Sequence, residues 1–308
     1  MESKSMTGRM TKLFALVAVF ALALTVLAGC GGNDQKVDTS SSDSSSSEAA
    51  ATEESSADSS SSAAAADDNS ADITELIVGF DNSYPPYGFI GEDGEYTGLD
   101  LDLAAEVAKR NDWEFTAQPI DWDAKDAELN SGNINCIWNG FTMEGREDDY
   151  TFSEPYMLNE QVIVVKAGSD IATRDDLAGK IVITQLGGAA EELLEGDEKD
   201  LADTFGRLDT IADYDNAYMQ LESGTVEVVI GDLSIAQYHI ANTPDTFVML
   251  DEPLSSEHYA VGFKKGSEAL ADVINKTLLE MYEDGTVAEI VAKYAEYGVD
   301  INNWQLTK

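Results

Sequence analysis

The sequence of 308 residues contains little cysteine and little histidine. Its two cysteines, Cys30 and Cys136, cannot build a disulfide framework if either one is modified, and the apolar neighbours of Cys136 predict a small buried side chain. The two histidines, His239 and His258, are far apart and have no cysteine at zinc-ligand spacing. The sequence therefore predicts no disulfide scaffold, no metal site and no cofactor.

Basic residues are scarce as well, with 18 Lys and Arg against 59 Asp and Glu. Four of the basic and 11 of the acidic residues precede residue 73, which leaves 14 and 48 beyond it and a net charge of −34. Such a surface repels polyanions, so nucleic acid and anionic lipid headgroups are excluded as partners. A general solubilising surface explains the charge without any binding role, and the field favours neutral or cationic ligands.

The amino terminus carries an uncharged apolar run at 13–28, which follows three basic residues. The run is short for a bilayer span and ends in small residues, so it predicts a signal peptide at 1–29. Its end, Leu27-Ala28-Gly29-Cys30, resembles the lipobox of bacterial lipoproteins, in which a diacylglyceryl group is attached to the cysteine. The resemblance implies lipidation of Cys30, and the alternative is a general secretory signal that ends in a chance cysteine.

Serine, alanine and acidic residues dominate the next stretch, from residue 33 to residue 72. This composition offers almost nothing to bury and cannot offset the entropy of ordering. We expect residues 30–72 to form a flexible tether and residues 73–308 to form the folded part.

The folded part alternates predicted strands and helices, which indicates an α/β fold. Leu99, Leu103 and Val107 share one face of a helix in which Asp100 is a plausible cap. The predicted strands are at 75–80, 113–119, 134–138, 161–166, 180–184, 226–231 and 246–250, and the predicted helices begin at 99, 124, 190, 216, 233, 267 and 287.

Polar residues follow the apolar strand predicted at 134–138. Asn139-Gly140 is a turn signal that ends this strand, and Thr142 and Arg146 come next on a polar loop. In an open α/β sheet, ligands bind beyond the carboxyl ends of the strands. The sequence therefore indicates a ligand site in this loop.

Arg146 is the cation of this loop, and its planar guanidinium can bind a carboxylate through two N–H groups at once. The alternative is that Arg146 only forms a surface ion pair with one of the acidic residues at 147–149. The residues of the loop alone leave both possibilities open.

Several segments of the folded part read VGFDNSYPPY at 78–87, GLDLDLA at 98–104, NGFT with Arg146 at 139–146, and VGFKKG with MYEDGT at 261–286. In this order they resemble the extracellular solute-binding proteins of polar amino-acid ABC importers. The resemblance spans residues 76–298. It implies a two-lobed periplasmic-binding-protein-like (type II) fold with a ligand cleft between the lobes. It also implies one lobe at 73–161 plus 257–308 and the other at 162–256.

The resemblance also implies roles for individual residues. Arg146 would bind the ligand carboxylate, although its loop after Thr142 is one residue shorter than is usual in the family. Asp232 would bind the ligand ammonium group, and its alternative role is the N-cap of the following helix.

The remaining implied contacts surround the rest of the ligand. Tyr84 and Trp122 would sandwich its side chain, and Asp81 would tune recognition of that side chain. Gly188 and Ala189 would donate backbone N–H groups, without the hydroxyl that many relatives have at these positions. The further contacts would come from the backbone and side chains of Asn139, Gly140 and Thr142.

The function implied is capture of a polar amino acid and its delivery to an ABC permease, by a monomer that is no enzyme. The chain would lie on the extracytoplasmic face of the bacterial cell membrane, anchored through Cys30. One alternative is an enzyme on the same scaffold, similar to cyclohexadienyl dehydratases, in which Asp81 or Asp232 would act as acid or base. The other is a lipid-anchored sensor or surface adhesin that uses the cleft without transport.

Overall fold

The structure is a computed structural model, and it describes residues 73–307. The predicted signal peptide, Cys30 and the tether at 30–72 lie outside the described residues. Between residues 73 and 307, no helix is both long and apolar enough to cross a bilayer.

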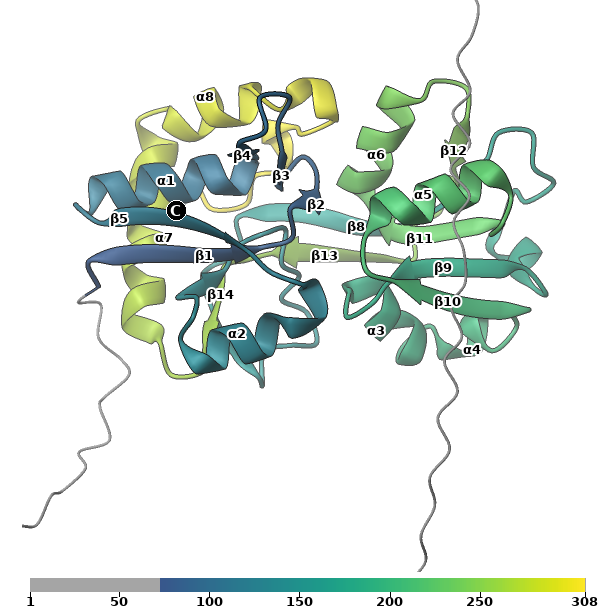
Figure 1. The fold of residues 1–308 in the computed structure, drawn as a ribbon, viewed down its shortest axis with the longest axis horizontal. Coiled ribbons are helices and arrows are strands. Elements are labelled where there is room, and N and C mark those ends of the chain that lie inside the picture. The colour runs from purple at the N-terminus through teal and green to yellow at the C-terminus, as the bar shows by residue number, and fades with distance from the viewer. Residues whose placement is uncertain (1–72, 308) are drawn as a thin grey trace, which may run out of the picture. The chain divides into compact units, whose positions relative to one another are not determined.

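The first lobe is built on a five-stranded sheet (Figure 1). Its longest-paired strand, β1 (Glu75–Phe80), has the predicted bounds and lies between the parallel strands β5 (Glu114–Pro119) and β6 (Cys136–Ile137). The strands β14 (Gly262–Lys264) and β7 (Tyr150–Phe152) extend the sheet in antiparallel pairing. The strand predicted at 134–138 is therefore present, although shorter than expected.

Helices cover both faces of this sheet, as α1 and α2 show on opposite sides of β1 in Figure 1. The helix α2 (Lys125–Ser131) packs through Leu129 into a small apolar cluster. A larger cluster lies on the other face and includes Cys136, which confirms the buried cysteine. The helices of this lobe that contribute to the larger cluster include α1 (Leu99–Arg110), α7 (Glu268–Glu283) and α8 (Thr286–Ala292).

The second lobe has its own sheet, in which β9 (Ile181–Gln185) lies between the parallel strands β10 (Arg207–Ile211) and β11 (Val228–Asp232). Beyond β11 follow β8 (Met157–Lys166) and β12 (Phe247–Met249), both in antiparallel pairing. The strand β11 is apolar apart from its last residue and is buried throughout, as expected for a strand covered on both faces.

Helices cover both faces of the second sheet too, as Figure 1 shows. One face carries α5 and α6 and the other carries α3 and α4. The bounds of these four helices are α3 (Ala189–Glu195), α4 (Lys199–Ala202), α5 (Tyr214–Ser223) and α6 (Leu233–Asn242).

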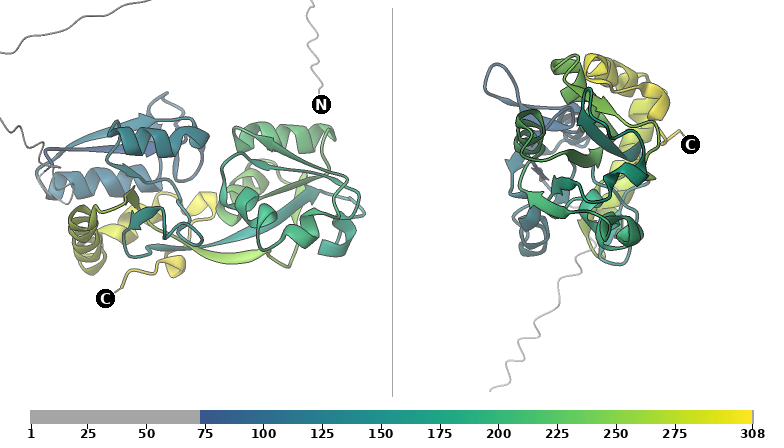
Figure 2. Two further views of the ribbon diagram at one scale, coloured as in Figure 1. Left: turned by 90° about the horizontal axis from the view of Figure 1, so that it is seen from below. Right: turned by 90° about the vertical axis from the view of Figure 1, so that its right-hand side faces the viewer.

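Two strands run between the lobes (Figure 2). The strand β13 (Ser255–Tyr259) pairs with the first half of β8, from Met157 to Gln161, and the second half of β8 pairs with β11. Gln161 lies where the two pairings meet, since it is opposite both Ser255 and Asp232. The two-lobed α/β fold is thus confirmed. The predicted lobe boundaries, at 161–162 and 256–257, fall within these two strands.

The turn before α1 corrects one expectation, because Asp100 does not cap this helix. The N-cap position is Gly98, and the Asp100 carboxylate instead accepts hydrogen bonds from the Gly140 N–H at 2.6 Å and the Tyr156 hydroxyl at 2.7 Å. Asp100 is the second residue after the N-cap, already inside the first turn, so it does not occupy the position from which a side chain caps the helix. Its carboxylate instead stabilises the Asn139-Gly140 turn. Burial raises the pKa of its carboxyl to about 7.

A small sheet before α1 was not predicted. It consists of β2 (Ser83–Tyr84), β3 (Gly88–Ile90) and β4 (Tyr96–Thr97). Its strands have two or three residues, too few for a periodicity to show in a sequence.

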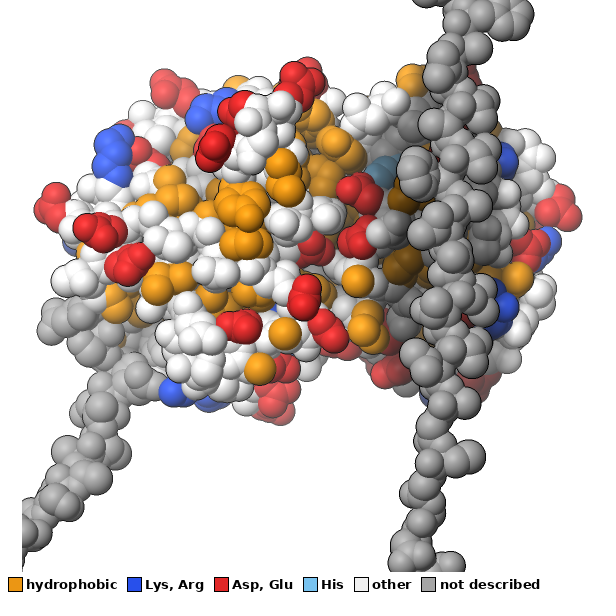
Figure 3. Space-filling view, in the orientation of Figure 1, with side chains coloured by type: hydrophobic (Ala, Val, Ile, Leu, Met, Phe, Trp, Pro, Cys, Tyr) orange, Lys and Arg blue, Asp and Glu red, His pale blue; other side chains and the backbone are white. Residues whose placement is uncertain are grey.

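Acidic side chains are spread over both lobes on the face that Figure 3 shows. They do not gather in one patch there. This distribution favours the solubilising role of the charge.

Gly98 generates a stability prediction. Its φ of 147° is open to glycine almost alone, and a Cβ there would lie 2.1 Å from the Tyr87 carbonyl oxygen. We expect Gly98→Ala to lower the free energy of unfolding by about 3 kcal/mol or more in urea titrations. The control Gly94→Ala has positive φ but open space around it and should lose about 1 kcal/mol. Equal losses would contradict the steric explanation.

Candidate functional site

Several predicted site residues lie at or just beyond the carboxyl end of a strand. Asp81 follows β1, Asn139 and Gly140 follow β6, and Asp232 is the last residue of β11. Such ends are where an α/β sheet presents backbone and side chains to a ligand.

Arg146 is, with Lys125, a buried cation where the lobes meet, and it is 5% exposed. Its Nε lies 3.0 Å and its Nη2 lies 2.9 Å from the carboxylate oxygens of Glu192, on α3 of the second lobe. Its Nη1 donates to the Thr142 carbonyl oxygen at 3.1 Å, and its guanidinium lies 4.7 Å from the centre of the Phe141 ring. The surface pair with residues 147–149 is wrong, because the ion pair of Arg146 within the described residues is with Glu192.

Two buried carboxylates lie at the other end of the site, on Asp232 and Glu257. The Gln161 amide nitrogen lies 2.8 Å from Asp232 Oδ1 and 2.9 Å from Glu257 Oε1. The Asn159 amide nitrogen contacts the same two oxygens, at 2.8 and 2.7 Å. The Tyr259 hydroxyl donates to Asp232 Oδ1 at 2.9 Å.

Asp232 holds the N-cap position of α6, yet its carboxylate makes no hydrogen bond to an N–H of that helix. Its carboxylate accepts instead from Asn159 and Gln161 of β8 and from Tyr259 of β13. The alternative in which Asp232 serves as an N-cap is therefore wrong as far as its side chain is concerned.

Burial raises the pKa of both carboxyls, and each negative charge disfavours the other. The pKa of Glu257 rises to about 7, first through burial and then through the Asp232 charge. Burial likewise raises the pKa of Asp232, although hydrogen bonds from Tyr84 and Tyr259 oppose the shift. The pair therefore holds a proton readily near neutral pH.

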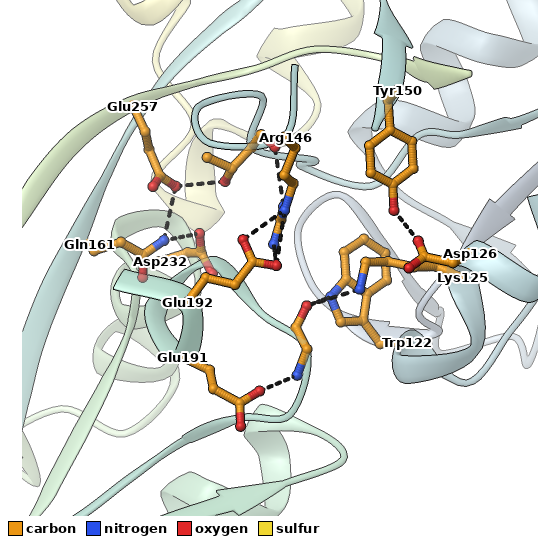
Figure 4. A network of polar contacts seen from close by, with 12 residues as sticks. Trp122, Lys125, Asp126, Arg146, Tyr150, Gln161, Glu191, Glu192, Asp232 and Glu257 are labelled. Carbon is orange, nitrogen blue, oxygen red and sulfur yellow. Dashed lines mark hydrogen bonds and ion pairs between the residues drawn. The ribbon is translucent and has the colours of Figure 1, made fainter. Parts of the chain in front are cut away.

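Thr142 connects the cation to the carboxylate pair. Its hydroxyl donates to Glu257 Oε1 at 2.8 Å, and its carbonyl oxygen accepts from Arg146. In Figure 4, Gln161, Asp232 and Glu257 lie on one side of Arg146, and Trp122 and Lys125 lie on the other. One residue thus separates a buried guanidinium from two buried carboxylates.

Residues 185–187 of the second lobe contact the first lobe directly. The Gln185 amide donates to Asp81 Oδ2 at 2.7 Å, and Trp122 Nε1 and Lys125 Nζ each donate to the Gly187 carbonyl oxygen at 3.1 Å. Burial, followed by the nearby Arg146 charge, lowers the pKa of Lys125. Lys125 is therefore a cross-lobe contact, a role that its place in the sequence did not reveal.

The Asp81 carboxyl is buried as well, and its pKa rises to about 6. Burial is the main cause, and the charges of Asp213 and Asp215 add to it. The backbone N–H of Asp81 donates to the Asn139 side-chain oxygen at 2.9 Å. Asn139 therefore fixes the loop that carries Asp81.

The predicted aromatic residues lie in the same region but are not stacked on each other. Tyr84 packs against Tyr214 with ring centres 6.3 Å apart, and its hydroxyl is 3.4 Å from that of Tyr259. Trp122 packs edge-on against Phe141 at 5.7 Å. Their role as a sandwich around a ligand stays a prediction.

Gly188 is the N-cap of α3 and Ala189 is its first residue, as the predicted backbone site requires. The Gly188 N–H donates to the Gln185 carbonyl oxygen at 3.2 Å, and the Gly187 N–H donates to the Glu191 carboxylate at 2.6 Å. Two backbone N–H groups of this loop thus already have partners within the second lobe.

Sequence reasoning missed the polar side chains of the crossing strands. Asn159, Gln161 and Glu257 have polar neighbours such as Glu160 and His258, so the strand pattern there predicts an exposed face. No local signal distinguishes them, because their burial appears only in the fold. Glu192, in an acidic run on α3, carried no distinguishing signal. Among residues 73–307, no group of three or more His, Cys, Asp and Glu side chains could hold a metal ion.

Two α/β lobes joined by two crossing strands, with buried charged side chains where the lobes meet, define a two-lobed ligand-binding protein. The family model of bacterial extracellular solute-binding proteins, family 3, matches residues 76–297. The chain belongs to this family.

Individual relatives agree. The chain is 32% identical over 229 residues to the L-cystine-binding protein TcyJ of Escherichia coli K12, covering 73% of this chain and 84% of that protein. A substrate-binding protein of an ABC uptake transporter from Streptococcus pneumoniae, solved with bound histidine, superimposes with a TM-score of 0.70 at 31% identity and covers 74% of this chain and 95% of that one. The ancestral amino-acid-binding protein AncCDT-1, a precursor of cyclohexadienyl dehydratase, gives a TM-score of 0.66 at 28% identity and covers 72% and 95%.

The carboxylate pair generates a pH prediction. Folding raises the pKa of the Glu257 carboxyl from 4.5 to about 7. The contribution of this group to stability is therefore fully present below pH 4.5 and is lost as the pH rises through about 7. Relative to Glu257→Gln, the wild type should therefore lose on the order of 2 kcal/mol of unfolding free energy between pH 5 and pH 8. Urea titrations at both pH values measure the difference.

Glu289→Gln, on the exposed surface of α8, is the matched control and should show no such pH-dependent difference from the wild type. A difference for Glu257→Gln that does not change with pH would contradict the proton-sharing explanation.

Proposed function

We propose that this protein captures an α-amino acid between its two lobes and delivers it to an ABC importer, without chemical turnover. The observation that carries the proposal is the position of Thr142 between the Arg146 guanidinium and the Asp232–Glu257 carboxylate pair. An α-amino acid carries its carboxylate and its ammonium group on one carbon, so its receptor needs opposite charges this close together.

Arg146 binds the ligand carboxylate in this proposal. The guanidinium already holds one carboxylate side-on, that of Glu192, so its two outer N–H groups are oriented for this geometry. The Thr142 carbonyl and the Phe141 ring fix the guanidinium from behind.

Asp232 binds the ammonium group, with Glu257 behind it. A cation entering beside the pair neutralises their repulsion and displaces the proton that the pair holds. The Tyr259 hydroxyl and the two amides of β8 keep the Asp232 carboxylate in place.

The ligand side chain then faces Tyr84, Trp122 and Asp81. Asp81, with Asp213 and Asp215 nearby, favours a positively charged or amino-bearing side chain. L-cystine and L-histidine, named for the two relatives described above, and L-arginine are therefore the first ligands to test.

The setting of the binding event follows the same reasoning. We propose that the chain acts as a monomer on the extracytoplasmic face of the bacterial membrane, anchored through lipidated Cys30, with an ABC permease as its partner. Family membership supports the extracellular location, and the lipobox-like sequence supports the anchor.

The alternative enzyme, similar to cyclohexadienyl dehydratase, would use a carboxyl of raised pKa such as Glu257 or Asp81 as its acid. Incubation of the protein with each ligand, followed by chromatography, separates the two functions. Ligand recovered unchanged and in stoichiometric complex supports capture, and the appearance of product would contradict it.

Substitutions at both ends of the ligand test the proposal. We expect Arg146→Ala and Asp232→Asn each to weaken binding of the best ligand in a calorimetric amino-acid panel by about 30-fold or more, because each leaves a ligand charge without its partner. Arg207→Ala is the control, since Arg207 lies half-exposed on β10 and pairs only with Asp209 among the described residues. Undiminished affinity in Arg146→Ala would show that the carboxylate binds elsewhere.

A further inference from the structure

Glu192 holds the donors that the proposed function assigns to the ligand. Arg146 Nε lies 3.2 and 3.0 Å from its two carboxylate oxygens, and Arg146 Nη2 lies 2.9 Å from the first of them. A free carboxylate bound side-on to the same guanidinium edge would use the same N–H groups. Glu192 and a ligand carboxylate therefore cannot both hold this edge.

The two partners of this ion pair differ in freedom. The Arg146 side chain is 6% exposed and is held by the Thr142 carbonyl and the Phe141 ring. The Glu192 side chain is 48% exposed, and Arg146 is the only hydrogen-bond partner that its carboxylate has among the described residues. Glu192 can therefore enter water when another carboxylate takes its place, whereas Arg146 is held where it is.

The pair also joins the lobes, because Arg146 follows β6 of the first lobe and Glu192 lies on α3 of the second. Gln185 and Gly187, which come from the same segment of the second lobe, make further contacts with the first lobe. Glu191, the residue before Glu192, accepts from the Gly187 N–H and so fixes the loop that leads into α3.

We propose that Glu192 is an internal competitor that sets the affinity of the site: its carboxylate latches the two lobes through Arg146 and must leave when the ligand carboxylate arrives. This inference rests on the proposed function, since it takes the Arg146 guanidinium as the group that binds the ligand carboxylate. When Glu192 occupies the Arg146 guanidinium in the free protein, the apparent affinity for the ligand falls. It falls in proportion to the fraction of time for which the guanidinium is free.

Glu192→Gln tests the latch, because glutamine keeps the size of the side chain and loses the charge. Glu195→Gln is the matched control, since it makes the same charge change at an exposed position one turn later on the same helix, where no hydrogen bond or ion pair to Arg146 forms. The first measurement is hydrogen exchange of the full chain without added amino acid. The second is calorimetric affinity for L-cystine, L-arginine and L-histidine.

The latch predicts faster exchange of segments 120–126 and 185–195 in Glu192→Gln, together with about three- to tenfold tighter binding of whichever probe binds the wild type. Glu195→Gln should match the wild type in both measurements. Weaker binding in Glu192→Gln would overturn the inference, because Glu192 would then belong to the ligand's own contacts. Unchanged exchange or unchanged affinity would overturn it as well.

The outcome also separates the inference from the proposed function. If none of the three probes binds the wild type, the proposed function fails for these ligands, and the exchange measurement still decides whether Glu192 latches the lobes. If a probe binds and Glu192→Gln behaves as the wild type does, the function stands and the latch is wrong.

Discussion

The cleft depends on one constraint, which is that a charge removed from water must have a partner of opposite charge or a full set of hydrogen bonds. Arg146 meets it through Glu192 and the Thr142 carbonyl, and the Asp232–Glu257 pair meets it through two amides and two hydroxyls. Satisfying these groups requires residues from both lobes and from both crossing strands. The arrangement of the lobes and the chemistry of the site are therefore one property of the fold.

Gln161 links the arrangement of the lobes to the chemistry of the site. Its backbone lies where β8 passes from pairing with β13 to pairing with β11, and its side chain bridges the two buried carboxylates. A change in the relative position of the lobes would bend the chain near this residue. It would thereby alter the surroundings of the carboxylates.

Much of the fold could be predicted from the sequence, because long periodic segments carry their own signal. The strand β1 has the predicted bounds, and α1 begins where Gly98 and the spacing of Leu99, Leu103 and Val107 place it. Segments of two or three residues, such as β2 and β4, carry no such signal. The side chain of Asp100 was misassigned because its partner, the Gly140 N–H, is 40 residues away along the chain.

The candidate site was predictable only in part, and for the same reason. Arg146 and Asp232 stand at strand ends within recognisable segments, so their sequence context indicated them. Glu257 and Glu192 act through partners that are 115 and 46 residues distant, and nothing in their local sequence distinguishes them from surface acids. The pairing of Arg146 with a remote glutamate, and not with an adjacent acid, is a tertiary feature.

The central claim is that one site binds both charged groups of an α-amino acid. Calorimetry of the unsubstituted protein tests it most directly, with the best ligand of the panel compared with its carboxamide and its N-acetyl derivative. The account predicts that each derivative binds at least about 30-fold more weakly than the parent, because each leaves a buried charge of the cleft unpaired. Parent-like affinity of either derivative would contradict the account.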